Sequence, residues 1–265
     1  MHYPRRLFWL CSCLLIACTA SPNATTSAEQ AVSNASEAKL VNPGITTPDT
    51  QLIVVTTPAW DQFRGKLHRF EGGSSNWKTA AEPIDIVVGK NGLGWSVHEK
   101  EKQSMGGPIK KEGDLKSPAG IFNLGTAFGY AETATWLQYP YWPITTATMC
   151  IEDVQSEYYN QIIDEGEVPA DWSSTDHMLR KDDLYEWGIF VEHNYPEAQP
   201  KGGSCIFIHV WNPKRTGTAG CTAMDKGEIQ ILMAWLDQDK AQRMIQMPQP
   251  IYDELQTAEQ WPALN

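Results

Sequence analysis

The sequence predicts a mainly β fold of the α+β type. Short runs rich in β-branched and aromatic residues follow one another closely, Gly and Pro separate them, and turn dipeptides such as "NG" and "GG" stand nearby. This spacing favours antiparallel strands over βαβ units, which need a helix between parallel strands. The strongest expected strands are "QLIVVTT" (51–57), "PIDIVVGKNGLGWSV" (83–97), "AGIFNLGTAFGY" (119–130), "WGIFVEHNY" (187–195) and "CIFIHVW" (205–211).

A helix is predicted directly after the last of these runs and a short loop. Asp225 and Glu228 have the spacing of a capping box. The apolar residues that follow recur at i, i+3, i+4 and i+7, namely Ile229, Leu232, Met233 and Leu236. We expect this helix to pack one face on the sheet and to fix the loop before it. The acidic segments 156–166 and 176–185 are also compatible with helices.

The charge of the chain excludes one class of function. The 265 residues carry 21 Lys and Arg against 32 Asp and Glu, which gives a formal net charge of −11. A nucleic-acid-binding surface needs a basic face to contact phosphates. We therefore expect no nucleic-acid partner.

The N-terminus has the pattern of an export signal. Arg5 and Arg6 precede an apolar run over 7–17 that is too short to span a bilayer. The run ends in "LIAC", residues 15–18, which resembles the lipobox of bacterial lipoproteins. We predict a signal peptide over 1–17, a lipid on Cys18, and an outer-membrane location facing the periplasm if the host has two membranes. The alternative is plain cleavage near 17–20, without a lipid.

The rest of the chain divides into a tether and one domain. Residues 18–50 are mostly Ser, Thr, Ala, Asn and Glu and hold too few large apolar residues to build a core. We expect them to form a flexible tether between the membrane and a single catalytic domain over 51–265. No internal repeat is present.

The cysteines left after export are odd in number. Cys11 and Cys13 leave with the signal and Cys18 carries the lipid, which leaves Cys150, Cys205 and Cys221. An oxidising compartment permits disulfides, and an odd count leaves one thiol free. We expect Cys221 to be the free one and Cys150 and Cys205 to be able to pair.

Cys221 stands in an unusual setting, "GTAGCTAM", residues 217–224. Small neighbours suit an approachable, reactive sulfur and leave backbone N–H groups free for an oxyanion. His209 ends an apolar run 12 residues earlier, which leaves room for a strand, a loop and a return. A Cys nucleophile with a His base is therefore possible. The alternative is a buried structural cysteine and a core histidine; no C-x-x-C or H-x-x-x-H spacing suggests a metal.

Several blocks together resemble the L,D-transpeptidase catalytic domain of the YkuD type. They are "GKNGLGW", "KKEGDLKSPAGIFNLGTAFGY", "YEWGIFVEHN" and "IFIH…GTAGCTAM", and the likeness covers about residues 51–239. The resemblance implies a β-sandwich-like fold and no cofactor. It also implies a cysteine that attacks a tetrapeptide stem of peptidoglycan and passes the acyl group to an amine. The family's motif falls on His209 as base, Thr218, Gly220 and the nucleophile Cys221.

The motif also departs from the family pattern. Ala219 stands where the family has a second His, Ala223 where it has Arg or Asn, and Val210 where it has Gly. We expect the loop Thr218–Ala219–Gly220 to contact the oxyanion or substrate and Trp211 to line the site. An amidase or L,D-carboxypeptidase that uses water as acceptor stays open, as does a wall-binding lipoprotein without turnover. If the enzymatic reading holds, the Cys221 sulfur should be accessible, with its pKa lowered by His209.

Overall fold

The structure is a computed structural model and describes residues 49–73 and 76–264. The predicted signal peptide, Cys18 and nearly all of the predicted tether lie outside these residues. Within the described part of the chain, no helix is both long and apolar enough to cross a bilayer.

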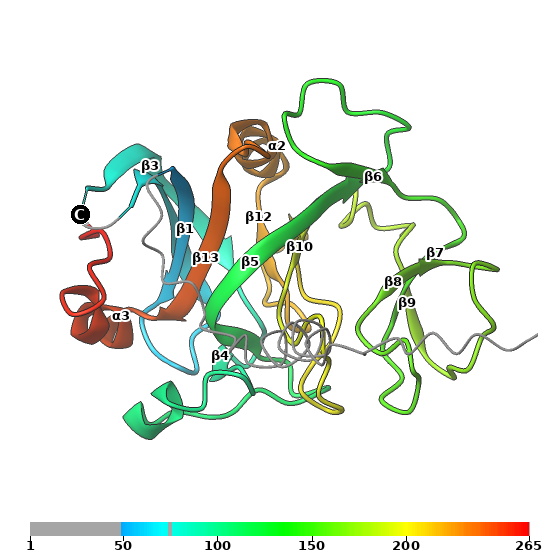
Figure 1. The fold of residues 1–265 in the computed structure, drawn as a ribbon, viewed down its shortest axis with the longest axis horizontal. Coiled ribbons are helices and arrows are strands. Elements are labelled where there is room, and N and C mark those ends of the chain that lie inside the picture. The colour runs from blue at the N-terminus through cyan, green and yellow to red at the C-terminus, as the bar shows by residue number, and fades with distance from the viewer. Residues whose placement is uncertain (1–48, 74–75, 265) are drawn as a thin grey trace, which may run out of the picture. The chain divides into compact units, whose positions relative to one another are not determined.

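Ten strands form the main sheet (Figure 1). They are β1 (Thr50–Thr57), β2 (Arg64–Gly72), β3 (Lys78–Val87), β4 (Leu93–Trp95), β5 (Ser117–Gly129), β6 (Tyr141–Pro143), β10 (Trp187–Val191), β11 (Phe207–Val210), β12 (Thr222–Met224) and β13 (Ala241–Pro248). Their order is β10-β11-β12-β3-β2-β1-β13-β5-β4, with β6 added beside β5. Because β10 also pairs with β5, the sheet closes on itself.

The closed sheet encloses most of the core. β1 pairs with β2 on one side and with β13 on the other, and all of its residues are buried. An apolar strand of this kind is expected when both of its faces are covered. The run predicted at 51–57 is thus a central strand, and the mainly β class is confirmed.

Two α-helices cover parts of this sheet. They are α2 (Lys226–Trp235) and α3 (Gln249–Gln256), and a 3-10 turn lies at Lys102–Met105. The Asp225 carboxylate caps α2 by accepting from the Gly227 N–H at 2.9 Å. Ile229, Leu232 and Met233 are buried, as the apolar spacing predicts. The predicted helix after the cysteine loop is confirmed, although its cap binds the N–H of Gly227 and not that of Glu228.

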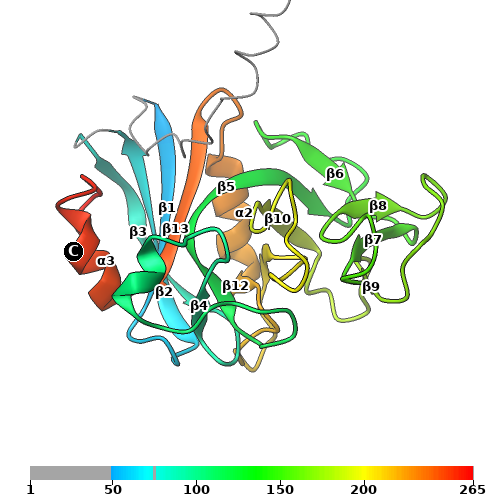
Figure 2. The same ribbon diagram turned by 60° about the horizontal axis from the view of Figure 1, so that its bottom comes forward.

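A second, smaller sheet is inserted between β6 and β10. It consists of β7 (Thr148–Ile151), β8 (Ile162–Asp164) and β9 (Thr175–His177), in the order β8-β7-β9. Figures 1 and 2 show these strands at the opposite end of the main sheet from α3. Met149, Ile151 and Ile163 form an apolar cluster of their own within it.

The segments 156–166 and 176–185, whose composition is compatible with helices, form no helix. These segments contain β8, the end of β9, and turns. Asn160 has a φ of 66°, Gly166 of 91° and Asp183 of 58°, and such left-handed residues interrupt a right-handed helix. Acidic composition alone therefore gave a misleading helix signal here.

Candidate active site

The register of two parallel strands brings His209 and Cys221 to one face of the sheet. Ile208 pairs with Thr222 and His209 with Ala223, so one step earlier Cys221 lies beside Phe207. The backbone N–H of Phe207 donates to the Cys221 Sγ at 3.3 Å, which agrees with this placement. Side chains two residues apart on a strand share a face. His209 and Cys221 are therefore diagonal neighbours, and the residue opposite His209 is only an alanine.

A backbone carbonyl orients the His209 ring. Its Nδ1 lies 2.7 Å from the carbonyl oxygen of Val210. A carbonyl can only accept, so Nδ1 carries the proton and Nε2 of the neutral ring is left as an acceptor. Burial lowers the pKa of His209 to about 4, which keeps the ring neutral near pH 7. The imidazole is thus prepared to take a proton through Nε2.

Cys221 is a free and buried thiol, with 7% of its surface exposed. Its sulfur lies 3.4 Å from the carbonyl oxygen of Cys205, to which the S–H donates. Burial raises the pKa of the Cys221 thiol to about 12. The N–H of Phe207 opposes this rise, whereas the charge of Asp176 adds to it. The sulfur is therefore a neutral thiol near pH 7.

The expectation of an accessible sulfur with a lowered pKa is wrong for this structure. The side chain of Cys221 lies in an apolar cluster with Phe128, Tyr185 and Phe207. Removal of water disfavours the thiolate, and a neutral imidazole brings no compensating charge. Small neighbours in the sequence do not ensure exposure, because residues from other segments of the chain cover the sulfur.

Two hydroxyl groups hold the nucleophile loop at one carbonyl. The Oγ1 of Thr218 and the Oγ of Ser117 donate to the carbonyl oxygen of Cys221 at 2.6 and 3.0 Å. The same Thr218 oxygen accepts from the Gly220 N–H at 3.2 Å. The Gly220 N–H is therefore bonded within the loop and not to a strand, and a role for Gly220 at the oxyanion stays a prediction. Ala219, between them, is exposed.

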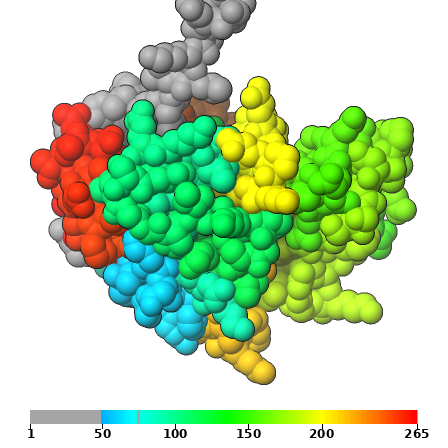
Figure 3. Space-filling view, turned by 90° about the horizontal axis from the view of Figure 1, so that it is seen from below, coloured from blue at the N-terminus to red at the C-terminus, as the bar shows by residue number. Residues whose placement is uncertain are grey.

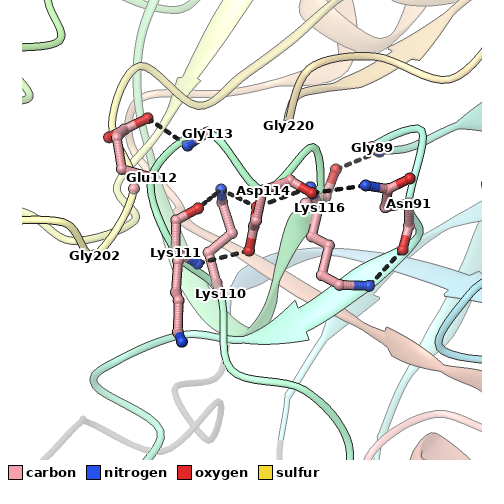
Figure 4. A network of polar contacts seen from close by, with 12 residues as sticks. Gly89, Asn91, Lys110, Lys111, Glu112, Gly113, Asp114, Lys116, Gly202 and Gly220 are labelled. Carbon is pink, nitrogen blue, oxygen red and sulfur yellow. Dashed lines mark hydrogen bonds and ion pairs between the residues drawn. The ribbon is translucent and has the colours of Figure 1, made fainter.

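Packing explains why positions 217 and 220 of this loop are glycines. A Cβ on Gly217 would lie 2.5 Å from the Cα of Lys90, so a larger residue would force the two segments apart. A Cβ on Gly220 would lie 3.3 Å from the carbonyl oxygen of Lys116, and Figure 4 shows Gly220 close to that residue. Close approach of backbones therefore explains part of the small-residue pattern.

The turn beneath this loop is built around one carboxylate. Asp114 accepts from the Lys110 Nζ at 2.7 Å and from the N–H groups of Lys111 and Lys116 at 2.7 and 2.9 Å. Figure 4 shows these contacts as one network. The Lys110 side chain is only 3% exposed, so the pair is largely out of water. Within the described ranges, no group of three or more His, Cys, Asp or Glu residues is placed to hold a metal ion.

Trp211 contacts Arg215 and Met224. The guanidinium of Arg215 lies 4.4 Å from the centroid of the Trp211 ring, and the Trp211 N–H donates to Met224. These contacts order the loop that follows β11. A role for Trp211 against the substrate stays a prediction.

The small sheet contributes residues to this site that the sequence did not indicate. The ring of Tyr185 packs against that of His209, and its hydroxyl donates to the carboxylate of Asp176 in β9. Glu152, which follows β7, is near enough for its charge, like that of Asp176, to raise the pKa of Cys221. Burial, followed by the charges of Asp176 and Glu112, raises the pKa of Glu152 to about 7. Tyr185 stands in the quoted "YEWGIFVEHN" block, but no spacing pattern pointed to the two acids.

A disulfide joins the small sheet to the nucleophile region. It links Cys150 of β7 to Cys205, 55 residues away, and Cys221 is the free cysteine of the described chain. This is the pairing that the cysteine count allowed, with Cys221 left free. Residue 205 is thereby tied to the small sheet just before β11 begins.

Comparison with known proteins identifies the family. The L,D-transpeptidase catalytic domain (YkuD) matches residues 65–247. Two crystal structures of the helical cell shape determining protein Pgp2 from Campylobacter jejuni, one of a mutant, are 17% and 18% identical, each with a TM-score of 0.39. Each match covers 77% of this chain and 50% of the Pgp2 chain, so the likeness spans half of that protein. A search of curated proteins finds no match. Since the family match spans most of the chain, this protein belongs to the L,D-transpeptidase catalytic domain family.

Proposed function

We propose that this protein is an L,D-transpeptidase that forms or remodels peptidoglycan crosslinks through a thioester on Cys221. The observation that carries the proposal is the contact between His209 Nδ1 and the Val210 carbonyl, on the face that His209 shares with Cys221. Nδ1 is committed to the carbonyl of Val210, so Nε2 has a lone pair for the thiol proton. His209 acts as general base and Cys221 as nucleophile.

The steps balance as an acyl exchange. His209 takes the proton of Cys221 while the sulfur attacks a carbonyl carbon of the donor stem peptide. The carbon–nitrogen bond breaks, the departing amine receives the proton from His209, and a thioester remains. An amine of a second stem then attacks the thioester and gives its proton to His209. The new amide is released and Cys221 regains its proton.

The resting protonation states indicate when the proton moves. With the pKa of Cys221 near 12 and that of His209 near 4, a free thiolate–imidazolium pair is strongly disfavoured. Proton transfer therefore accompanies formation of the carbon–sulfur bond. The buried thiol also stays neutral until a substrate occupies the site.

A water acceptor is the second candidate. Ala219 and Ala223 provide no polar side chain where the family has His and Arg or Asn, and Ala223 lies directly opposite His209. A site with fewer groups to hold an amine favours hydrolysis, which would make the protein an L,D-carboxypeptidase or amidase. A non-catalytic wall-binding lipoprotein is the third reading, and the burial of Cys221 supports it.

We also propose that the enzyme works at the cell envelope, anchored by a lipid on Cys18. The support is the arginine-led apolar run that ends in "LIAC". Peptidoglycan stem peptides would then be within reach of a tethered domain.

The test is mass spectrometry of muropeptides with tetrapeptide stems incubated with the purified protein. The wild type should form crosslinked products and carry an acyl group on Cys221, whereas Cys221→Ser should do neither. Trimmed stems without crosslinks would assign the water reaction. An unchanged mixture together with an unmodified Cys221 would contradict both enzymatic readings and favour the wall-binding one.

A further inference from the structure

The buried side chain of Asn160 connects the small sheet to the segment between β10 and β11. Asn160, in the turn between β7 and β8, is 1% exposed. Its Nδ2 donates to the carbonyl oxygens of His193 and Asn194 at 2.9 and 2.8 Å. Its Oδ1 accepts from the N–H of Cys205 at 2.9 Å. Both ends of the amide are thus used on backbone groups that lie between β10 and β11.

The small sheet holds Cys205 in two ways. The sulfur is bonded to Cys150 of β7, and the backbone N–H is bonded to Asn160. Cys205 has a φ of 55°, a left-handed conformation that residues with a Cβ rarely adopt. Such a conformation is kept only where neighbouring contacts hold it. At Cys205 the disulfide to Cys150 and the hydrogen bond to Asn160 are these contacts.

The backbone conformation of residue 205 affects how the sulfur of Cys221 is held. The carbonyl of Cys205 accepts the Cys221 S–H at 3.4 Å, and the N–H of Phe207 donates to the same sulfur at 3.3 Å. The acceptor and the donor flank a single residue, Ile206. A change in the backbone at 205 therefore alters the carbonyl contact, whereas Phe207 is held in β11 by its pairing with Phe190.

We propose that Asn160 is a positioning residue for the nucleophile: together with the Cys150–Cys205 disulfide it clamps residue 205, whose carbonyl sets the direction of the Cys221 thiol. This inference rests on the proposed function, in which Cys221 is the attacking group. The role of the inserted sheet is then to fix the sulfur for attack.

The clamp has two opposite effects on the thiol. A carbonyl that accepts the S–H stabilises the neutral form, so its removal makes the thiolate easier to form. The same contact aligns the sulfur, so its removal scatters the direction of attack. Loss of the clamp should therefore lower the pKa of Cys221 and slow acylation. A residue that only stabilised the fold would not be expected to lower the pKa of Cys221 and slow acylation together.

The main variant is Asn160→Gly in the full chain. Glycine tolerates the φ of 66° at this position but cannot hold Cys205. The thiolate absorbance of Cys221 is titrated against pH, with the same variant carrying Cys221→Ser as a blank for tyrosines. We expect the midpoint to fall by about one pH unit, the weight of one hydrogen bond to one protonation state. Acylation, followed by intact mass, should slow by about 10- to 100-fold.

Asn194→Gly is the matched control. Asn194 is also 1% exposed and left-handed, with a φ of 52°. Its Nδ2 donates to the carbonyls of Gln199 and Gly203, and its Oδ1 accepts from the N–H of Gln199, so the side chain holds a neighbouring loop and not residue 205. The carbonyl that Asn160 uses belongs to the backbone of Asn194 and is kept in the variant. It should lose stability without moving the Cys221 midpoint. An equal shift in both variants, or none in Asn160→Gly, would overturn the proposal.

A second route tests the clamp if Asn160→Gly does not fold. The double variant Cys150→Ser/Cys205→Ser cuts the covalent arm and leaves the Asn160 contact, and its midpoint should also fall. An unchanged or raised midpoint there would overturn the proposal. Different results would contradict the proposed function: turnover that persists in Cys221→Ser, or a wild-type protein that forms no acyl-enzyme. The thiolate titration needs no turnover and so decides the clamp in either case.

Discussion

The ring of Tyr185 packs edge-on against the ring of His209, with centroids 5.2 Å apart. The Tyr185 hydroxyl donates to the Asp176 carboxylate at 2.6 Å, and the Arg180 guanidinium lies 5.0 Å from the Tyr185 centroid. Burial raises the pKa of Tyr185 well above its ordinary value, so the phenol stays a neutral donor. Asp176 belongs to β9, so the small sheet reaches the proposed base as well as the proposed nucleophile.

The first prediction concerns the charge of Asp176. This carboxylate raises the pKa of Cys221, so Asp176→Asn should lower the pKa of that thiol. The amide oxygen can still accept from Tyr185, which preserves the packing on His209. We expect the midpoint of thiolate formation to fall by up to about one pH unit, measured by ultraviolet titration against a Cys221→Ser blank.

Asp182→Asn is the control for that change. Asp182 also pairs with Arg180, at 2.6 Å, but its side chain is 48% exposed. Solvent screens such a charge, so the midpoint of Cys221 should stay as in the wild type. A shift of the same size in both variants would show a general charge effect and would contradict a specific role for Asp176.

Much of the main sheet could be predicted from the sequence because its signals are local. The apolar run at 51–57 became the buried strand β1, and the spacing of Ile229, Leu232 and Met233 gave the buried face of α2. The 12-residue spacing of His209 and Cys221 left room for a strand, a loop and a return. These features depend on residues close in the chain. However, β11 and β12 pair in parallel, which the predicted antiparallel arrangement did not give.

The surroundings of the thiol could not be predicted because they depend on distant segments. Cys150 and Cys205 are 55 residues apart, and Asp176 comes from a region whose acidic composition suggested a helix. The burial of Cys221 arises from Phe128, Tyr185 and Phe207, which lie on three different parts of the chain. No sequence pattern around residue 221 indicates that these three side chains cover the sulfur.

The second prediction concerns membrane attachment. Because the "LIAC" run resembles a lipobox, Cys18→Ser should release the protein from membranes into the soluble fraction. Cell fractionation followed by intact-mass measurement of the mature N-terminus checks this. A wild-type protein that begins near residue 18 without a lipid would establish plain signal cleavage.

The third prediction concerns the disulfide. Cys150 and Cys205 close a loop of 55 residues, for which loop-closure entropy gives about 4 kcal/mol at most. Cys150→Ser should therefore lower the free energy of unfolding by an amount up to this value, measured by urea denaturation. Ser156→Ala, in the same inserted region, should have a much smaller effect because it removes hydrogen bonds alone. Alkylation of both thiols in folded, non-reduced protein would contradict the pairing.

The fourth prediction is a loss of stability in mild acid that comes from two buried histidines. Burial lowers the pKa of His209 to about 4 and that of His193 to about 3, against an ordinary value of 6.5. Both rings are neutral in the folded protein near pH 5, whereas the unfolded chain binds a proton at each. The unfolded state then holds more protons, so stability is complete above pH 6.5 and falls as the pH drops toward 4 and 3.

The size of this loss can be measured by substitution. Each histidine should cost about 2–3 kcal/mol between pH 7 and pH 4.5. His193→Gln removes one of the two titrating groups and leaves an amide that can donate to the Gly202 carbonyl, now bonded to Nε2 at 3.0 Å. The difference in unfolding free energy between the two pH values should therefore shrink by that amount in His193→Gln. The exposed His177 provides the control, since His177→Gln should leave the difference as in the wild type. If His193→Gln kept the full wild-type loss, the histidine would be protonated in the folded state at pH 4.5, and its burial would not govern the acid response.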